Sequence, residues 1–171
     1  MENTDKKVLN KSILILLILV ALFILLILVA GKNRNEGEAT VTRNVGKQAI
    51  INLNGHNLVA SVADSARTRE QGLAGVHYLN DQSGMWFVFE EADEHAFWMK
   101  GTKVALDMAW VSSVGTIVHI EENVLPESYP KVFTSPVPAQ YVLEVNAGYF
   151  ERNGIEVGDT IVATPITPAK N

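Results

Sequence analysis

Two residues of opposite charge, Lys100 and Asp107, interrupt a mostly apolar stretch, FWMKGTKVALDMAW at residues 97–110. The apolar and aromatic residues on either side of Gly101–Val104 predict two short antiparallel strands joined by a turn. Because side chains alternate between the faces of a strand, Trp98, Lys100 and Asp107 would share one face. The other, core-facing side would carry Phe97, Met99, Leu106, Met108 and Trp110. An aromatic ring beside a cation and a carboxylate is typical of a pocket for a small polar molecule.

The same two charges also fit a simpler interpretation, an ion pair on a solvent-exposed face of the sheet. Such a pair stabilises a fold by at most about 1 kcal/mol. A buried pair is costly unless further hydrogen bonds satisfy both groups. Burial of Asp107 would therefore favour a functional role over the solvated ion pair.

Glu144 is another acidic residue within an apolar strand pattern, YVLEV. The strand period of two places Tyr141, Leu143 and Val145 on one face and Glu144 on the other. Glu122 ends the segment TIVHIEE in the same manner. Each glutamate also fits an ordinary solvated position on a strand.

Arg69 lies in a segment, SARTREQGL, whose serine and glycine predict the two ends of one short helix. Its guanidinium would either be solvated or neutralise one of the carboxylates. The predicted ligand-binding residues are Trp98, Lys100, Asp107, Arg69 and Glu144.

Several other kinds of site find little support in the sequence. The absence of cysteine excludes disulfides, zinc–cysteine sites and thiol catalysis. The four histidines, at positions 56, 77, 95 and 119, lack a metal-ligand spacing. Met85, His95, Met99 and Met108 offer soft ligands for Cu(I), but core packing explains the methionines better. We therefore predict neither a metal nor a cofactor. A catalytic pair among Asp107, Glu122 and Glu144 stays open, because it depends on a separation that the sequence does not give.

Residues 49–164 predict a mainly β domain, a small sandwich or barrel with one short helix. Seven or eight short segments rich in β-branched and aromatic residues alternate with glycine, proline, asparagine and aspartate. There is no room for the crossover helices of a βαβ fold. The segment VLPESYPKVFTSPVPA, at residues 124–139, carries four prolines and predicts a long loop, either an edge cover or a functional segment.

The N-terminal part contains an uninterrupted apolar run, ILILLILVALFILLILVA at residues 13–30. As a helix this run spans about 27 Å, close to the hydrocarbon thickness of a bilayer. We expect a tail at 1–12, a transmembrane anchor at 13–31 and a flexible linker at 32–48, with a C-terminal tail at 165–171. A cleaved signal peptide is the alternative, although its apolar region is usually shorter.

The charges flanking this span favour a cytoplasmic N-terminus. Three lysines precede the span, whereas one lysine and one arginine follow it closely. The rest of the chain would then lie outside the cytoplasm, attached to the cell membrane by a single pass. That part carries a net charge of about −6, which opposes binding to nucleic acid and to anionic lipid.

Five ordered blocks of sequence resemble domain-of-unknown-function family 192, a group of small, often exported or membrane-anchored prokaryotic proteins. They are REQGLAG (69–75), GMWFVF (84–89), FWMK followed by LD (97–100 and 106–107), YVLEVNAG (141–148) and GIEVGD (154–159). The resemblance implies a compact β fold, no established activity, and a polar pattern on Arg69, Lys100, Asp107 and Glu144.

The chain departs from the family pattern at three positions. Gly101 replaces the usual asparagine, Ala105 replaces a proline, and Val76 replaces an arginine. If a shared anion site depended on that arginine, this protein would have lost part of it.

These observations favour a membrane-anchored extracytoplasmic domain that binds a small polar ligand or a partner in the cell envelope. Trp98 would stack on the ligand, Lys100 would hold an anionic group, and Asp107 would orient Lys100 or accept hydrogen bonds. The alternatives are an envelope hydrolase or lyase with Asp107 or Glu144 as general base, and a structural interaction module that uses the proline-rich loop.

Overall fold

The computed structural model describes residues 46–166. The predicted N-terminal tail, the anchor and nearly all of the linker lie outside the described residues, as do residues 167–171 of the predicted C-terminal tail. Within residues 46–166, no helix is long and apolar enough to cross a membrane. The elements are β1 (Gln48–Leu53), β2 (His56–Ala63), α2 (Ala66–Gln71), β3 (Ser83–Asp93), β4 (Leu106–Val111), β5 (Ile117–Val124), the 3₁₀ turn η1 (Pro126–Ser128), β6 (Ala139–Asn146), α3 (Tyr149–Asn153) and β7 (Ile161–Ile166).

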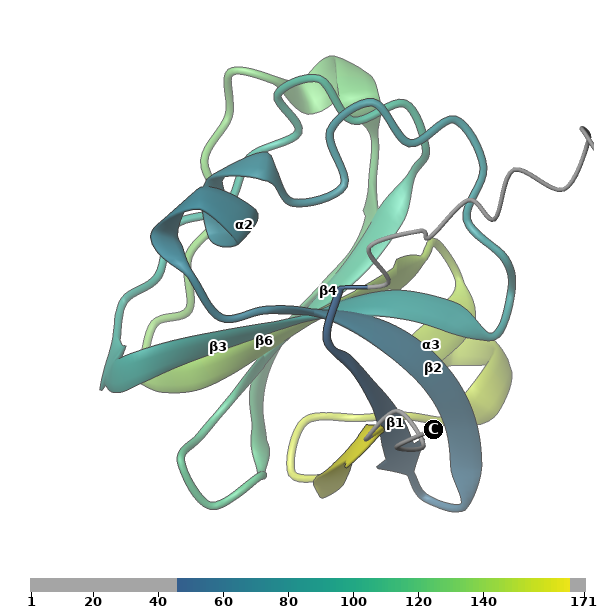
Figure 1. The fold of residues 1–171 in the computed structure, drawn as a ribbon, viewed down its shortest axis with the longest axis vertical. Coiled ribbons are helices and arrows are strands. Elements are labelled where there is room, and N and C mark those ends of the chain that lie inside the picture. The colour runs from purple at the N-terminus through teal and green to yellow at the C-terminus, as the bar shows by residue number, and fades with distance from the viewer. Residues whose placement is uncertain (1–45, 167–171) are drawn as a thin grey trace, which may run out of the picture. The chain divides into compact units, whose positions relative to one another are not determined.

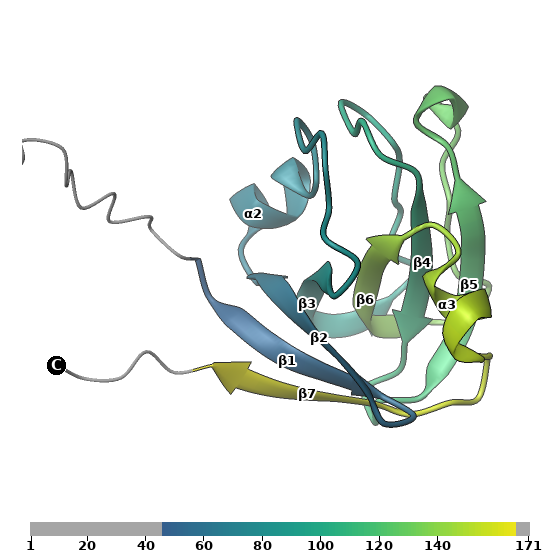
Figure 2. The same cartoon turned by 90° about the vertical axis from the view of Figure 1, so that its right-hand side faces the viewer.

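The strands form one open seven-stranded sheet in the order β5-β4-β6-β3-β2-β1-β7 (Figure 1 and Figure 2). Neighbouring strands are antiparallel except β2 and β3, which are parallel. A parallel pair needs a crossover connection, and the segment containing α2 supplies it. The prediction of a mainly β fold is therefore confirmed, in the form of a single open sheet with short helices.

The sheet is strongly curled, and its two edges approach each other at one end (Figure 2). Thr116, just before β5, forms an isolated antiparallel bridge with Thr160, just before β7. The Ile161 amide donates to the Gly115 carbonyl oxygen at 2.8 Å. A Cβ at position 115 would lie 2.8 Å from the Ile161 carbonyl oxygen, so only glycine permits this approach. The strands thus form neither the predicted two-layered sandwich nor a closed barrel, although the curl brings the two edges of the open sheet together at one end.

Two apolar clusters cover the two faces of the sheet, and strand alternation assigns residues to them. On β4, Met108 and Trp110 belong to one cluster, whereas Ala109 and Val111 belong to the other. The first cluster includes Leu73, which follows α2, and the second includes Phe150 of α3. Each short helix therefore covers a different face.

The predicted hairpin between residues 97–100 and 105–108 is wrong. Strand β4 is hydrogen-bonded to β5 on one side and to β6 on the other. Both edges of β4 are thus occupied, which leaves no edge for the preceding segment. Phe97 instead forms an isolated bridge with Phe133 in the proline-rich loop.

Asp107 is fully buried, and its carboxylate links two distant segments to β4 through hydrogen bonds. One oxygen accepts a hydrogen bond from the Asn123 amide at 2.9 Å, and the other accepts one from the Phe150 amide at 3.2 Å. Asn123 has a left-handed backbone, with φ of 54°, and Phe150 lies in the first turn of α3. The buried carboxylate therefore joins β4 to the end of β5 and to α3.

We expect Asp107→Ala to reduce the free energy of unfolding by about 2–5 kcal/mol, because two buried amide groups would lose their acceptor. Urea unfolding of the full-length chain in detergent, followed by tryptophan fluorescence, measures this change. Glu122→Ala is the matched control, since Glu122 is exposed and should shift stability by no more than about 0.5 kcal/mol. Equal unfolding midpoints for Asp107→Ala and the wild type would show that the hydrogen bonds of Asp107 do not stabilise the fold.

Candidate functional site

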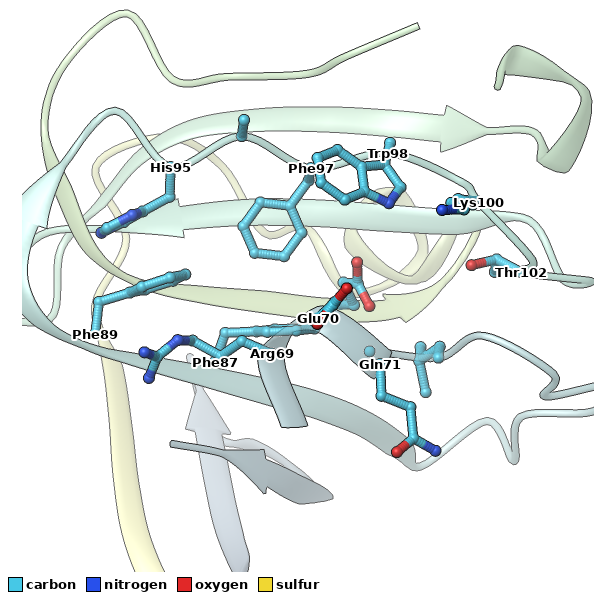
Figure 3. Close-up of a pocket in the computed structure, with 14 residues that line it drawn as sticks. Arg69, Glu70, Gln71, Phe87, Phe89, His95, Phe97, Trp98, Lys100 and Thr102 are labelled. Atoms are coloured by element: carbon cyan, nitrogen blue, oxygen red, sulfur yellow. The ribbon is translucent and has the colours of Figure 1, made fainter. Parts of the chain in front are cut away.

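A pocket opens on the face of the sheet that carries α2 (Figure 3). Its volume is about 270 Å³. Its walls come from α2 and the residues after it, from β3, from the segment at 95–102, and from β6. The lining residues are Arg69, Glu70, Gln71, Gly72, Leu73, Phe87, Phe89, His95, Ala96, Phe97, Trp98, Lys100, Thr102 and Glu144.

The first wall is α2, which is held on the sheet by Arg69. Ser65 caps the helix by accepting a hydrogen bond from the Thr68 amide at 3.2 Å, as the sequence predicts. The Arg69 guanidinium donates to the Val88 carbonyl oxygen at 2.9 Å and lies 5.0 Å from the centre of the Phe89 ring. Arg69 therefore neutralises neither Asp107 nor Glu144 by an ion pair, and instead anchors α2 to β3.

The second wall is the segment at 95–102, which is fixed at two points. Phe97 and Phe133 exchange backbone hydrogen bonds at 2.9 Å in both directions, and the Trp110 indole donates to the His95 carbonyl oxygen at 3.0 Å. The Phe97 ring meets the Phe87 ring edge to face at 4.9 Å. The proline-rich loop thus supports the wall that presents Trp98 and Lys100.

Glu144 is the acidic residue of the inner pocket. It lies on the central strand β6, in register with Met85 of β3 and Met108 of β4. Its side chain is buried, with 4% exposure, and Oε2 has no hydrogen-bond partner within the described chain. Burial raises the pKa of Glu144 to about 8. The group is therefore mostly an uncharged carboxylic acid at neutral pH.

The structure brings four of the five predicted ligand-binding residues together. Arg69, Trp98, Lys100 and Glu144 all line the pocket. Asp107 does not, because it precedes Met108 on β4 and so projects from the opposite face, where it is satisfied by backbone amides. Its predicted contact with Lys100 depended on the hairpin and is absent.

The three phenylalanines of the pocket were missed as site residues by the sequence interpretation. Phe87 and Phe89 lie on the same face of β3, and Phe97 faces them from the second wall. Figure 3 shows His95 above the Phe89 ring at one end and Lys100 and Thr102 at the other. Alternation along GMWFVF was the signal that could have placed both β3 rings beside Glu144.

Of the three carboxylates left open as a catalytic pair, only Glu144 lines the pocket. Glu122 is exposed, and Asp107 lies on the other face. Among the described residues, no group of three histidine, aspartate or glutamate side chains is arranged to hold a metal ion. Met99 and Met108 lie in the apolar cluster on the pocket face of the sheet.

The model of the family DUF192, described as "Uncharacterized ACR", matches residues 49–163. The chain belongs to this family. A search of curated proteins gives no significant match.

Two crystal structures resemble this DUF192 chain. One is a proposed transcription regulator from Sinorhizobium meliloti 1021, with 35% identity and a TM-score of 0.64 over 68% of this chain and 92% of that one. The other is a protein of unknown function from Novosphingobium aromaticivorans DSM 12444, with 26% identity and a TM-score of 0.65 over 71% of this chain and 89% of that one.

Four of the five blocks that carry the DUF192 resemblance converge on the pocket. REQGLAG, GMWFVF, FWMK and YVLEVNAG lie far apart in the sequence, yet they supply 11 of the lining residues. The remaining three are His95, Ala96 and Thr102. This convergence singles out the pocket as the candidate site of the DUF192 domain.

We expect the stability of the DUF192 domain to depend on pH through Glu144. Because burial raises its pKa from 4.5 to about 8, the folded protein retains a proton that the unfolded chain releases. Its contribution is complete below about pH 4.5 and is lost as the pH rises through about 8. The loss should be on the order of several kcal/mol.

Urea unfolding of the wild type and of Glu144→Gln from about pH 5 to about pH 9 measures this effect. The amide does not titrate, so the stability of the variant relative to the wild type should increase with pH. Parallel stability curves for the two proteins would show that Glu144 titrates normally.

Proposed function

We propose that this protein is a membrane-anchored binding protein whose extracytoplasmic β domain holds a small polar ligand in the pocket. The observation that carries the proposal is the buried carboxyl group of Glu144, which lines the pocket and has an oxygen without a hydrogen-bond partner in residues 46–166. The ligand would supply the missing partner.

The energetic cost of Glu144 supports a functional role. A buried polar atom without a partner costs about 1–3 kcal/mol, and such atoms are uncommon in folded proteins. Glutamine would remove the ionisable group, and an apolar residue would remove the unsatisfied one. Glu144 is therefore less favourable for stability than either replacement would be. An unpaired carboxyl group is useful, however, where it must stay free to bind a ligand.

The pocket dimensions and walls support a small ligand. Its volume of about 270 Å³ lies just below the range of about 300–1,000 Å³ that is usual for drug-sized molecules. The inner walls are the apolar faces of Phe87, Phe97 and Leu73. Polar groups surround the opening, so a ligand with an apolar body and polar ends fits best.

A chemically diverse small-molecule screen by thermal shift tests ligand binding. We expect compounds that raise the Tm of the full-length wild-type protein in detergent to lose most of this shift with Ala96→Trp. Ala96 is exposed and lines the pocket, so an indole there would obstruct the opening without disturbing the core.

Ala92→Trp is the matched control, because Ala92 is exposed on β3 and does not line the pocket. Compounds should bind this variant as they bind the wild type. If every stabilising compound bound Ala96→Trp equally well, the pocket would not be the binding site.

A second candidate function is general acid catalysis, and the raised pKa of Glu144 favours it. An acid with a pKa of about 8 is protonated at neutral pH and can donate its proton to a bound substrate. Mass spectrometry of each bound compound after incubation distinguishes the two functions. A new product formed by the wild type but not by Glu144→Gln would identify an enzyme, and an unchanged compound supports binding alone.

The membrane attachment and the extracytoplasmic location rest on the apolar run at 13–30 and on the charges around it. We expect an alkaline phosphatase fused after the last residue to be active in a bacterial host, and a β-galactosidase fused there to be inactive. Both fusions should stay in the membrane fraction after an alkaline wash. The reverse pair of activities, or release by the wash, would contradict this topology.

The acidic composition of this domain does not suit nucleic-acid binding by a transcription regulator, as the Sinorhizobium meliloti protein is described. Residues 46–166 contain seven Lys and Arg residues and 15 Asp and Glu residues. A phosphate backbone would be repelled by such a domain, since nucleic-acid binding depends on neutralising cations. The charge therefore supports a small-molecule ligand rather than a nucleic acid.

A further inference from the structure

The inner part of the pocket combines a carboxyl group with aromatic walls. Glu144 is flanked in register by Met85 and Met108, whose thioethers donate no hydrogen bonds. Phe87 and Phe97 line the same pocket. A ligand ammonium would form an ion pair with the carboxylate of Glu144 and would also be attracted by the electron-rich ring faces.

The charges around the pocket also favour an incoming cation at longer range. Residues 46–166 carry about twice as many acidic as basic residues, and such an excess concentrates cations at the surface. Glu70, an exposed residue of α2, places one of these carboxylates on the pocket itself. A simple anion would approach against this field.

The opening nevertheless carries a cation, Lys100, that residues 46–166 leave without an ion-pair partner. Lys100 is exposed, lines the pocket and forms no ion pair within the described chain. Arg69, by contrast, is engaged with Val88 and Phe89. Figure 3 shows Lys100 beside Trp98 and Thr102, at the end of the pocket away from Arg69. An anionic group of the ligand would find its partner at this end.

Building on the proposed binding function, we infer that the ligand is a small zwitterion. Its ammonium group lies against Glu144 between the aromatic walls, and its carboxylate lies at Lys100. Amino acids and related amino-carboxylates belong to this class. The two charges of the ligand match two ionisable groups of the pocket, the deep carboxyl group of Glu144 and the Lys100 ammonium at the opening.

This inference predicts the direction of proton movement on binding. Glu144 is mostly protonated at neutral pH, so an ammonium that pairs with its carboxylate must displace the proton into solution. A neutral ligand that accepts a hydrogen bond from the acid would displace none. The other titratable groups lining the pocket are Arg69 and Glu70 of α2 and His95 and Lys100 of the second wall. The residues in register with Glu144 are Met85 on β3 and Met108 on β4, and neither side chain is ionisable.

The test uses three matched series of probes on the full-length protein in detergent. The zwitterions are linear amino acids from glycine to 6-aminohexanoate, together with L-phenylalanine. The corresponding alkylamines lack the carboxylate, and the corresponding alkanoates lack the ammonium. Calorimetry gives the Kd of each probe, and a pH electrode in unbuffered solution near pH 7 gives the protons released.

We expect at least one zwitterion to bind about tenfold more tightly than its amine and its alkanoate, and to release close to one proton. Glu144→Gln should weaken its binding about tenfold or more and abolish the proton release. Lys100→Met should weaken binding of the zwitterion but leave the Kd of the amine unchanged. Glu122→Gln, outside the pocket, should change neither.

The inference is overturned if no zwitterion binds, if alkanoates bind as tightly as zwitterions, or if binding releases no proton. These results differ from a failure of the proposed function itself. If neutral or anionic compounds of the wider screen bind the wild type but not Ala96→Trp, the pocket is a binding site for another class of ligand. If no compound of any class shows this difference, binding in the pocket fails as well.

Discussion

Strand β6 lies between β3 and β4, and this central position determines the properties of Glu144. A side chain on a central strand cannot turn toward solvent at a sheet edge, and the methionines on both neighbouring strands give it no hydrogen-bond donor. The carboxyl group therefore stays uncharged at neutral pH, in contact with the pocket. The walls around it, the helix α2 and the segment at 95–102, are arranged on the same face of the sheet.

Two neighbouring carboxyl groups of this sheet have opposite roles because they lie on opposite faces. Asp107 pairs in register with Val145, and Glu144 pairs with the next residue of β4, Met108. Asp107 accepts two backbone amides and joins β4 to β5 and α3. Glu144 finds no such donor in the described part of the chain and lies next to a cavity. Satisfied hydrogen bonds mark the first group as structural, and the unsatisfied oxygen marks the second as a candidate for ligand contact.

The sequence predicts which face of the sheet a side chain lies on better than it predicts which strands pair. Alternation correctly places Glu144 on the other face of β6 from Leu143 and Val145. It also correctly places Met108 and Trp110 on one face of β4. The predicted pairing of β4 with residues 97–100 is wrong, because β4 pairs instead with the next strand, β5, and with the more distant β6, as in Leu106 with Asn146. Local turn signals around Gly101 do not reveal that both edges of β4 are taken. The position of Asp107 relative to Lys100 follows from pairing, and so it could not be predicted from alternation alone.

The register between β1 and β7 has a consequence for how the domain is made. Gln48–Leu53, at the start of the described chain, is hydrogen-bonded along its whole length to Ile161–Ile166, at the end. Pairings so distant in sequence form slowly, since a long loop must close before any contact is gained. During synthesis, β1 must wait with one unpaired edge until the last strand has emerged. The sheet is thus complete only when β7 pairs with β1. A chain that stops before β7 would leave the backbone of β1 exposed at a sheet edge, where it could pair with other chains and aggregate.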